Sequence, residues 1–189
     1  MSFESMTRLV TPRVRKAPFE LVRDELREAA IKFFTRTEVW RQKLDQMVFA
    51  AGQAEREIVL PSGSALVSVP EGTVDGEDLA VAGYAVGGDP ESLILGFVPT
   101  KESTVIIEAV LKPSFESSGI PEKLEAEYGR QIAAGAIAAL KAMRGTEWYD
   151  PEGAAIALDE FKGAIAAARR RRFQGKTNRS IYVQPVSFF

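Results

Sequence analysis

The chain has 189 residues, of which 46% are hydrophobic and 26% charged, and its formal net charge is −2 at pH 7. This is ordinary globular composition, and we expect one domain over residues 1–189, with no apolar run approaching the roughly 20 residues of a membrane span. The chain contains no cysteine and no histidine, which excludes disulfides, thiolate nucleophiles, the usual zinc sites and histidine-based proton transfer.

The first predicted element is a long amphipathic helix over residues 18–47. Pro18 suits the first helical position, because its missing N–H would have no partner there. Acidic residues follow the start and basic residues precede the end, as the helix dipole prefers. Apolar residues recur at steps of three and four along one stripe, except that Thr37 fills the gap before Trp40; the stripe comprises Phe19, Val22, Leu26, Ala29, Phe33, Trp40 and Leu44.

Residues from about 55 to 112 predict a small antiparallel β unit. Short segments rich in β-branched and apolar residues alternate with turn clusters, and Asp75-Gly76 suits a tight turn with positive φ. The unit is distinct in composition and bounded by loops. We therefore expect that a short linker could replace it while the helices still fold.

Helical periodicity returns over residues 121–173 and predicts an antiparallel helical hairpin. Pro121 opens the first helix and Gly145 closes it; Asp150 caps the second, which Pro151 begins. Small residues spaced four apart allow the helices to approach closely. We expect one helical core that comprises Leu26, Phe33, Trp40, Tyr128, Ile132, Leu140, Leu158, Phe161 and Ile165.

The chain ends on a basic segment and an extended arm. Arg169 to Arg172 close the last helix, and no acidic residue follows Phe161. The arginines suit a solvated helix end, a DNA contact or an acidic protein partner. Residues 175–189 form the predicted arm, in which Pro185 restricts any strand to a sheet edge. Such a strand must lie on its own sheet or on that of a neighbour.

Together these elements predict an α+β fold, and its sequence resembles a known family. The fold is a helical bundle with an inserted antiparallel β unit and an extended C-terminal arm. The segments "DELREAAIKFFTRTEVWR", "VIIEAVLKPS" and "IYVQPVSFF" resemble parts of the head–tail adaptor (connector) proteins of tailed bacteriophages. The hairpin resembles theirs most specifically, through Gly145, Trp148 and Pro151 of its turn.

The resemblance implies a structural role in the virion, at the head–tail junction, for a protein made in the host cytoplasm. Members form a ring, usually twelvefold, that docks on the portal protein and joins the capsid to tail or nozzle proteins. Double-stranded DNA passes through the channel without specific binding, and the acidic β unit is expected to face the channel or the tail. No catalytic site, cofactor, metal or membrane is implied.

The portal-binding residues that we expect lie in the basic segment and the arm. The alternative is a nucleic-acid-binding protein that uses the segment Arg169–Arg179; its basic residues are confined to one end of the hairpin instead of one face. The candidate partner-binding residues are Arg169, Arg170, Arg171, Arg172, Lys176, Arg179, Ile181, Tyr182, Val183, Pro185, Phe188 and Phe189.

Overall fold

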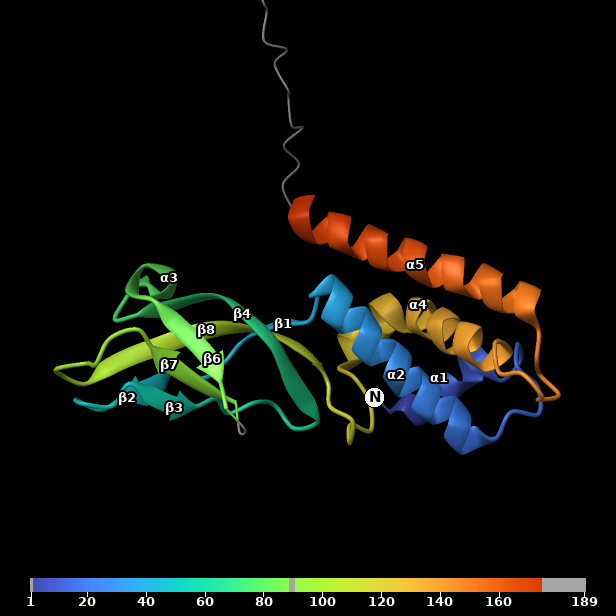
Figure 1. Cartoon of the computed structure of the whole chain (residues 1–189), viewed down its shortest axis with the longest axis horizontal. Helices are drawn as coiled ribbons and strands as arrows, with labels where there is room; N and C mark the ends of the chain where they lie inside the picture. The colour runs from blue at the N-terminus through green and yellow to red at the C-terminus, as the bar shows by residue number, and fades with distance from the viewer. Residues whose placement is uncertain (1, 89–90, 175–189) are drawn as a thin grey trace, which may run out of the picture.

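The computed structural model describes residues 2–88 and 91–174, and its fold is α+β. Within these residues it has five helices and two small antiparallel sheets. The long helices gather in one lobe and the strands in the other, so that the molecule is elongated (Figure 1). We call these two parts the helical lobe and the β lobe.

The helical lobe begins with a short helix, α1 (Phe3–Val10), which the periodicity analysis did not predict. Phe3, Met6 and Val10 are fully buried, because their spacing of three and four places them on one face. The Oγ of Ser2 accepts a hydrogen bond from the Glu4 N–H at 3.1 Å and caps the helix.

The second helix, α2 (Phe19–Thr37), is shorter than the predicted 18–47. It ends where Glu38 adopts a left-handed conformation with φ of 53°, and strands β1 (Arg41–Lys43) and β2 (Met47–Phe49) follow. Trp40 fits the helical spacing and is buried, but it lies beyond the helix end. The predicted apolar stripe therefore extended past the end of α2, because the Trp40 side chain enters the same core from the segment between α2 and β1.

The larger sheet has the strand order β1-β8-β4-β5, and β2 also pairs with β8. Its remaining strands are β4 (Ser64–Val74), β5 (Glu77–Asp78) and β8 (Ser103–Pro113). The predicted turn at Asp75-Gly76 is confirmed, since both residues have positive φ, 51° and 89°. The strands begin at Arg41 instead of the predicted residue 55, because the segment after α2 pairs with β8.

The smaller sheet has the order β3-β7-β6 and contributes to a separate hydrophobic core. Its strands are β3 (Glu55–Glu57), β6 (Tyr84–Gly87) and β7 (Ser92–Leu95), and the short helix α3 (Leu79–Ala82) precedes β6. The apolar side chains of this core come from both sheets, from α3 and from Ile58 between β3 and β4. The β lobe is thus stabilised mainly by its own apolar contacts.

Strand β8 joins the two lobes. Ala109 and Leu111 are fully buried in the helical core, and the Leu111 N–H donates to the carbonyl of Trp40 at 2.8 Å. An exchange of residues 55–112 for a linker would remove both core residues. The expectation that the helices fold without this segment stays a prediction, and a chain with that exchange would have to fold without these two buried side chains.

The hairpin of α4 (Glu122–Lys141) and α5 (Pro151–Gln174) packs against α2. The Gly153 N–H donates to Asp150 Oδ1 at 2.9 Å, so Asp150 caps α5 as predicted. A Cβ placed on Gly135 would lie 2.8 Å from the Phe161 ring, whereas one on Gly163 would meet nothing within 4 Å. Gly135 therefore lies in a close contact between helices, whereas Gly163 does not.

Eight of the nine predicted core residues are buried, and Leu158 is not. Its side chain is 41% exposed, although it is apolar and belongs to the hairpin. Phe161 lies three residues further along α5 and is buried against Phe33 at a ring-centroid distance of 6.2 Å. Leu158 therefore lies at the margin of the buried face of α5.

Candidate partner-binding surface

The four arginines at the end of α5 point in two directions. Ala168 is buried, and positions three and four residues after it return to the same side of a helix. Arg171 and Arg172 therefore reach carboxylates of neighbouring elements, although Arg171 remains exposed, whereas Arg169 and Arg170 are exposed and turn away. The predicted basic segment thus has two different environments within one helical turn.

Arg172 makes the more enclosed of the two ion pairs. Its guanidinium contacts the carboxylate of Glu38, and the two side chains are only 22% and 30% exposed. Glu38 is the residue with positive φ that ends α2, a conformation that costs a non-glycine residue about 1–2 kcal/mol. The pair fixes the end of α5 against the connection between the helical lobe and the β lobe.

Arg171 pairs with Glu127 of α4 across the hairpin. The distance from its Nη1 to Oε1 of Glu127 is 3.8 Å, and both side chains are substantially exposed. Such a pair contributes little to stability, since water and salt screen it. It nevertheless places a carboxylate between the arginine end and Tyr128.

A groove runs beside this helix end, between α5 and the β lobe. It is lined by residues of α4 and α5, by the segment after α2 and by Glu71 of β4. Arg41 lies in it, 3.1 Å from Glu108 and 3.7 Å from Glu71. Because the charges of the groove are largely paired within the chain, it presents a mixed surface instead of a basic one.

Tyr128 lies on the wall of this groove and remains protonated at any ordinary pH. Burial, together with a hydrogen bond to Glu127 and the charge of that carboxylate, raises the pKa of Tyr128 to about 12. Its ring packs 5.2 Å from that of Phe33. The residue is therefore a core aromatic with a polar edge, and nothing in its surroundings activates it as a base.

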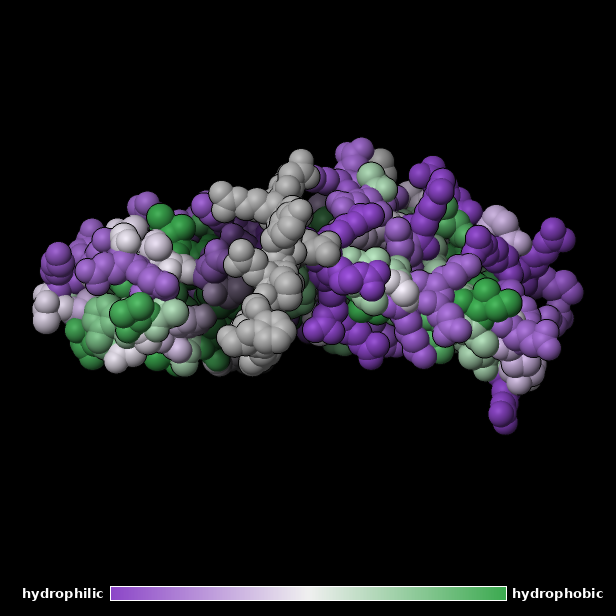
Figure 2. Space-filling view, turned by 90° about the horizontal axis from the view of Figure 1, so that it is seen from above, coloured by the Kyte–Doolittle hydropathy of each residue, from purple (hydrophilic) through white to green (hydrophobic). Residues whose placement is uncertain are grey.

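The exposed part of the arginine end is a small cationic and aromatic surface. Neither Arg169 nor Arg170 forms an ion pair with any residue in 2–88 or 91–174. Phe173 is 72% exposed, and the guanidinium of Arg172 lies 5.0 Å from its ring centroid. Figure 2 looks down on this side of the molecule, where hydrophilic side chains cover much of the helical lobe.

The other predicted partner-binding residues belong to the arm and lie outside the described residues. They are Lys176, Arg179, Ile181, Tyr182, Val183, Pro185, Phe188 and Phe189. Of the predicted set, the structure places only Arg169 to Arg172, and it brings these four together at the helix end where the arm begins.

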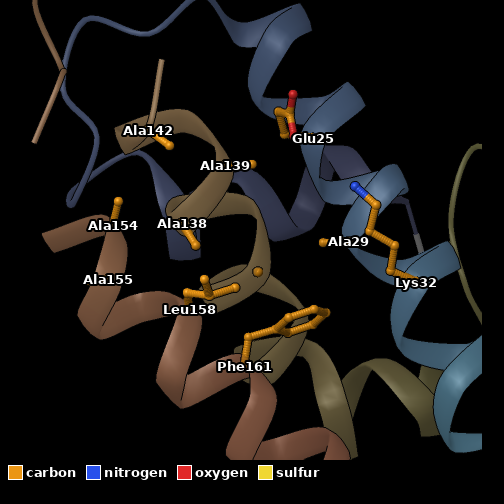
Figure 3. Close-up of a pocket in the computed structure, with 11 residues that line it drawn as sticks. Glu25, Ala29, Lys32, Ala138, Ala139, Ala142, Ala154, Ala155, Leu158 and Phe161 are labelled. Atoms are coloured by element: carbon orange, nitrogen blue, oxygen red, sulfur yellow. The ribbon is translucent and has the colours of Figure 1, made fainter. Parts of the chain in front are cut away.

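A second groove lies between α2, α4 and α5, where Leu158 forms part of the rim (Figure 3). Alanines and Gly135 line most of it, and Glu25 and Lys32 of α2 approach its edge. Burial raises the pKa of Glu25 above its usual value. A lone carboxyl and an amine on an alanine surface form no nucleophile–base pair and no ligand cage.

Two further properties bear on possible sites. Among residues 2–88 and 91–174, no group of three or more acidic side chains is arranged to hold a metal ion. In the same part of the chain, none of the helices combines the length and apolar character that a transmembrane span requires.

Sequence reasoning missed the acidic partners of the arginine end. Glu127 could have been found, since an antiparallel hairpin brings the start of α4 beside the end of α5. Glu38 could not, because the predicted helix ran through it and gave no reason for a turn there. The arginine run therefore looked uniformly free in the sequence.

Comparison with known proteins adds no assignment to this geometry: no protein-family model matches the chain, and no curated protein matches it either.

Proposed function

We propose that this chain is a structural virion protein, a subunit of the head–tail adaptor ring of a tailed bacteriophage. In this proposal the ring, usually twelvefold in such proteins, docks beneath the portal and joins the capsid to tail or nozzle proteins. The resemblance of the hairpin and its turn to those adaptors is the starting point, and the protein has no catalytic role.

The observation that carries the proposal is the exposed pair Arg169 and Arg170 at the end of α5. Both side chains are exposed, and the exposed ring of Phe173, which the guanidinium of Arg172 contacts, follows them on the same helix. An arginine beside an aromatic ring is well suited to a protein surface, since the guanidinium makes planar, two-pronged contacts with carboxylates. We assign these residues to the first contact with acidic groups of the portal.

The arm extends the same surface in this proposal. From Gly175 to the last residue it has 15 positions and can span at most about 50 Å when extended. It would add a strand to a sheet edge of the portal and bury Phe188 and Phe189 there. The acidic residues of the β lobe would then face the channel or the tail, where negative charge keeps DNA from binding.

Pairing within the chain favours this role over the nucleic-acid-binding alternative. Arg171 and Arg172 are engaged with Glu127 and Glu38, which leaves fewer cations to neutralise phosphates. A DNA-binding surface would instead gather many free cations along one face.

Truncation after Lys176 tests the proposal and separates it from the alternative. We expect the truncated chain to lose docking on the portal, with duplex DNA affinity weak and equal to that of the full chain. A variant with Arg169→Glu and Arg170→Glu, in which the arm is intact, should dock more weakly. The opposite result would be that the truncated chain still docks on the portal but loses a DNA affinity that, in the full chain, falls steeply with salt concentration. The nucleic-acid-binding hypothesis would then replace the adaptor proposal.

A further inference from the structure

One face of α5 is uncovered along its whole length. Its inner face carries Phe161, Ile165 and Ala168, which are buried in the helical core. On the other side, six exposed residues recur at steps of four and three and therefore share one stripe. We call it the outer stripe, and it consists of Glu152, Ile156, Asp159, Gly163, Ala166 and Arg170.

The shape of the outer stripe suits a second helix. Ile156 is 63% exposed and supplies an apolar side chain that a partner could cover. Gly163 and Ala166 are small, and a Cβ added to Gly163 would meet nothing within 4 Å. A neighbouring helix can approach closely over these two residues, and a large side chain of its own can fill the space above them.

The charges of the outer stripe run in one order along the helix. Glu152 and Asp159 lie in its first half, and Arg170 lies at its far end. Within the described part of the chain, none of these three is in an ion pair. The stripe is therefore acidic in its first half, where Ile156 lies between the two carboxylates, and basic at its far end, with Gly163 and Ala166 in between.

This order is self-complementary when a second copy of α5 runs antiparallel. With the two helices centred at the level of Phe161, Glu152 lies opposite Arg170, Ile156 opposite Ala166, and Asp159 opposite Gly163. Each pairing occurs twice by symmetry. A parallel arrangement would instead place each charged residue opposite its own copy, and the two carboxylates would repel the phosphates of a DNA strand.

We propose that free chains associate in antiparallel pairs through the outer stripe of α5, as a two-fold symmetric dimer. One helix face buries less than the roughly 800 Å² per partner that stable complexes bury, so the pair is weak and reversible. A closed ring uses two different surfaces of each subunit, whereas this contact uses one surface twice. The pair is thus an assembly of the free chain, and it covers Arg170.

Sedimentation velocity of the full chain without any portal tests this inference. Because no portal is present, a negative result would leave the proposed ring on the portal untouched. We expect a concentration-dependent shift from 20.7 kDa toward twice that mass. Gly163→Gln should weaken dimerisation at least about tenfold, since it fills the space needed by the partner. The fold should survive because, among residues 2–88 and 91–174, no atom lies within 4 Å of a Cβ at that position. Ala126→Gln adds similar bulk at an exposed position of α4 and should leave dimerisation unchanged.

Charge reversal gives a second, independent arm. Glu152→Arg and Arg170→Glu should each weaken the dimer, because each places like charges opposite one another twice. The double variant should restore it, since the same two positions again carry opposite charges. A chain that stays monomeric at every concentration, or a dimer that Gly163→Gln leaves intact, would overturn the proposal.

Discussion

At the scale of single residues, two glycines of the hairpin show how position decides the effect of one methyl group. A Cβ added to Gly135 would lie 2.8 Å from the Phe161 ring and 3.1 Å from the Cβ of Ala29. Gly163 lies in open space on the same hairpin. Both belong to the small-residue pattern of the sequence, but only Gly135 lies in the interface between helices.

We therefore expect opposite effects from the same substitution. Gly135→Ala should lower the free energy of unfolding by about 1–3 kcal/mol through overpacking. Gly163→Ala should raise it by about 0.5–1 kcal/mol, since glycine costs that much within a helix. Urea denaturation of both variants at low protein concentration measures the two changes. Equal effects at the two sites would show that the Phe161 ring moves aside freely.

Asp150 provides a pH-dependent test at the same scale. Hydrogen bonds from Lys141 and from the Gly153 N–H hold the pKa of Asp150 below its usual value. A carboxyl with a lowered folded-state pKa stabilises the protein above the unfolded pKa of about 3.9, and that contribution is lost as the pH falls through the folded pKa.

Wild type should therefore exceed Asp150→Asn in stability by more at about pH 6 than at about pH 2.5. Asparagine can still cap the helix, so the variant isolates the charge. Urea melts at both pH values give the comparison. A stability difference that does not change with pH would mean that the Lys141–Asp150 pair contributes nothing.

At the scale of elements, periodicity predicted both helices of the hairpin and the core face of α2 but not where α2 ends. The stripe included Trp40 because that side chain enters the same core. The helix does not continue because the segments that begin at Arg41 and Met47 pair as strands with β8. That pairing joins residues more than fifty positions apart, so the local spacing of apolar residues cannot reveal it. The arginine partner Glu38 depends on the same long-range packing, whereas Glu127 follows from the predicted hairpin.

The margin of the α5 core face can be measured with two truncations to alanine. Phe161→Ala should cost about 3–5 kcal/mol, because the side chain is buried against Phe33 and Gly135. Leu158→Ala should cost about 1 kcal/mol, since much of that side chain remains in water. Denaturant midpoints at unchanged slope give both values. A larger loss of stability in Leu158→Ala than in Phe161→Ala would show that Leu158, and not Phe161, lies on the buried face of α5.

At the scale of the whole molecule, β8 makes the two lobes one mechanical unit. Its end contributes Ala109 and Leu111 to the helical core, while Val105 and Ile107 belong to the core of the β lobe. The Arg172–Glu38 pair adds a second tie at the same junction. We expect the position of the arginine end to be fixed relative to the β lobe.

Such a molecule should unfold in one step. Helical circular dichroism and the fluorescence of Trp40 at the junction, measured in a Trp148→Phe variant because the chain has two tryptophans, should give coincident transitions in urea. Leu111→Ala should lower both midpoints together. Separate transitions would show that the lobes fold independently in spite of their shared strand.

Electron microscopy tests most directly whether this chain forms the proposed ring on a portal. The full chain would be mixed with portal dodecamers from the same phage and compared with portal alone. We predict an added collar of protein beneath the portal, with one copy of the chain per portal subunit, and no collar with the chain truncated after Lys176. Portal particles unchanged by a large excess of the full chain would contradict the claim.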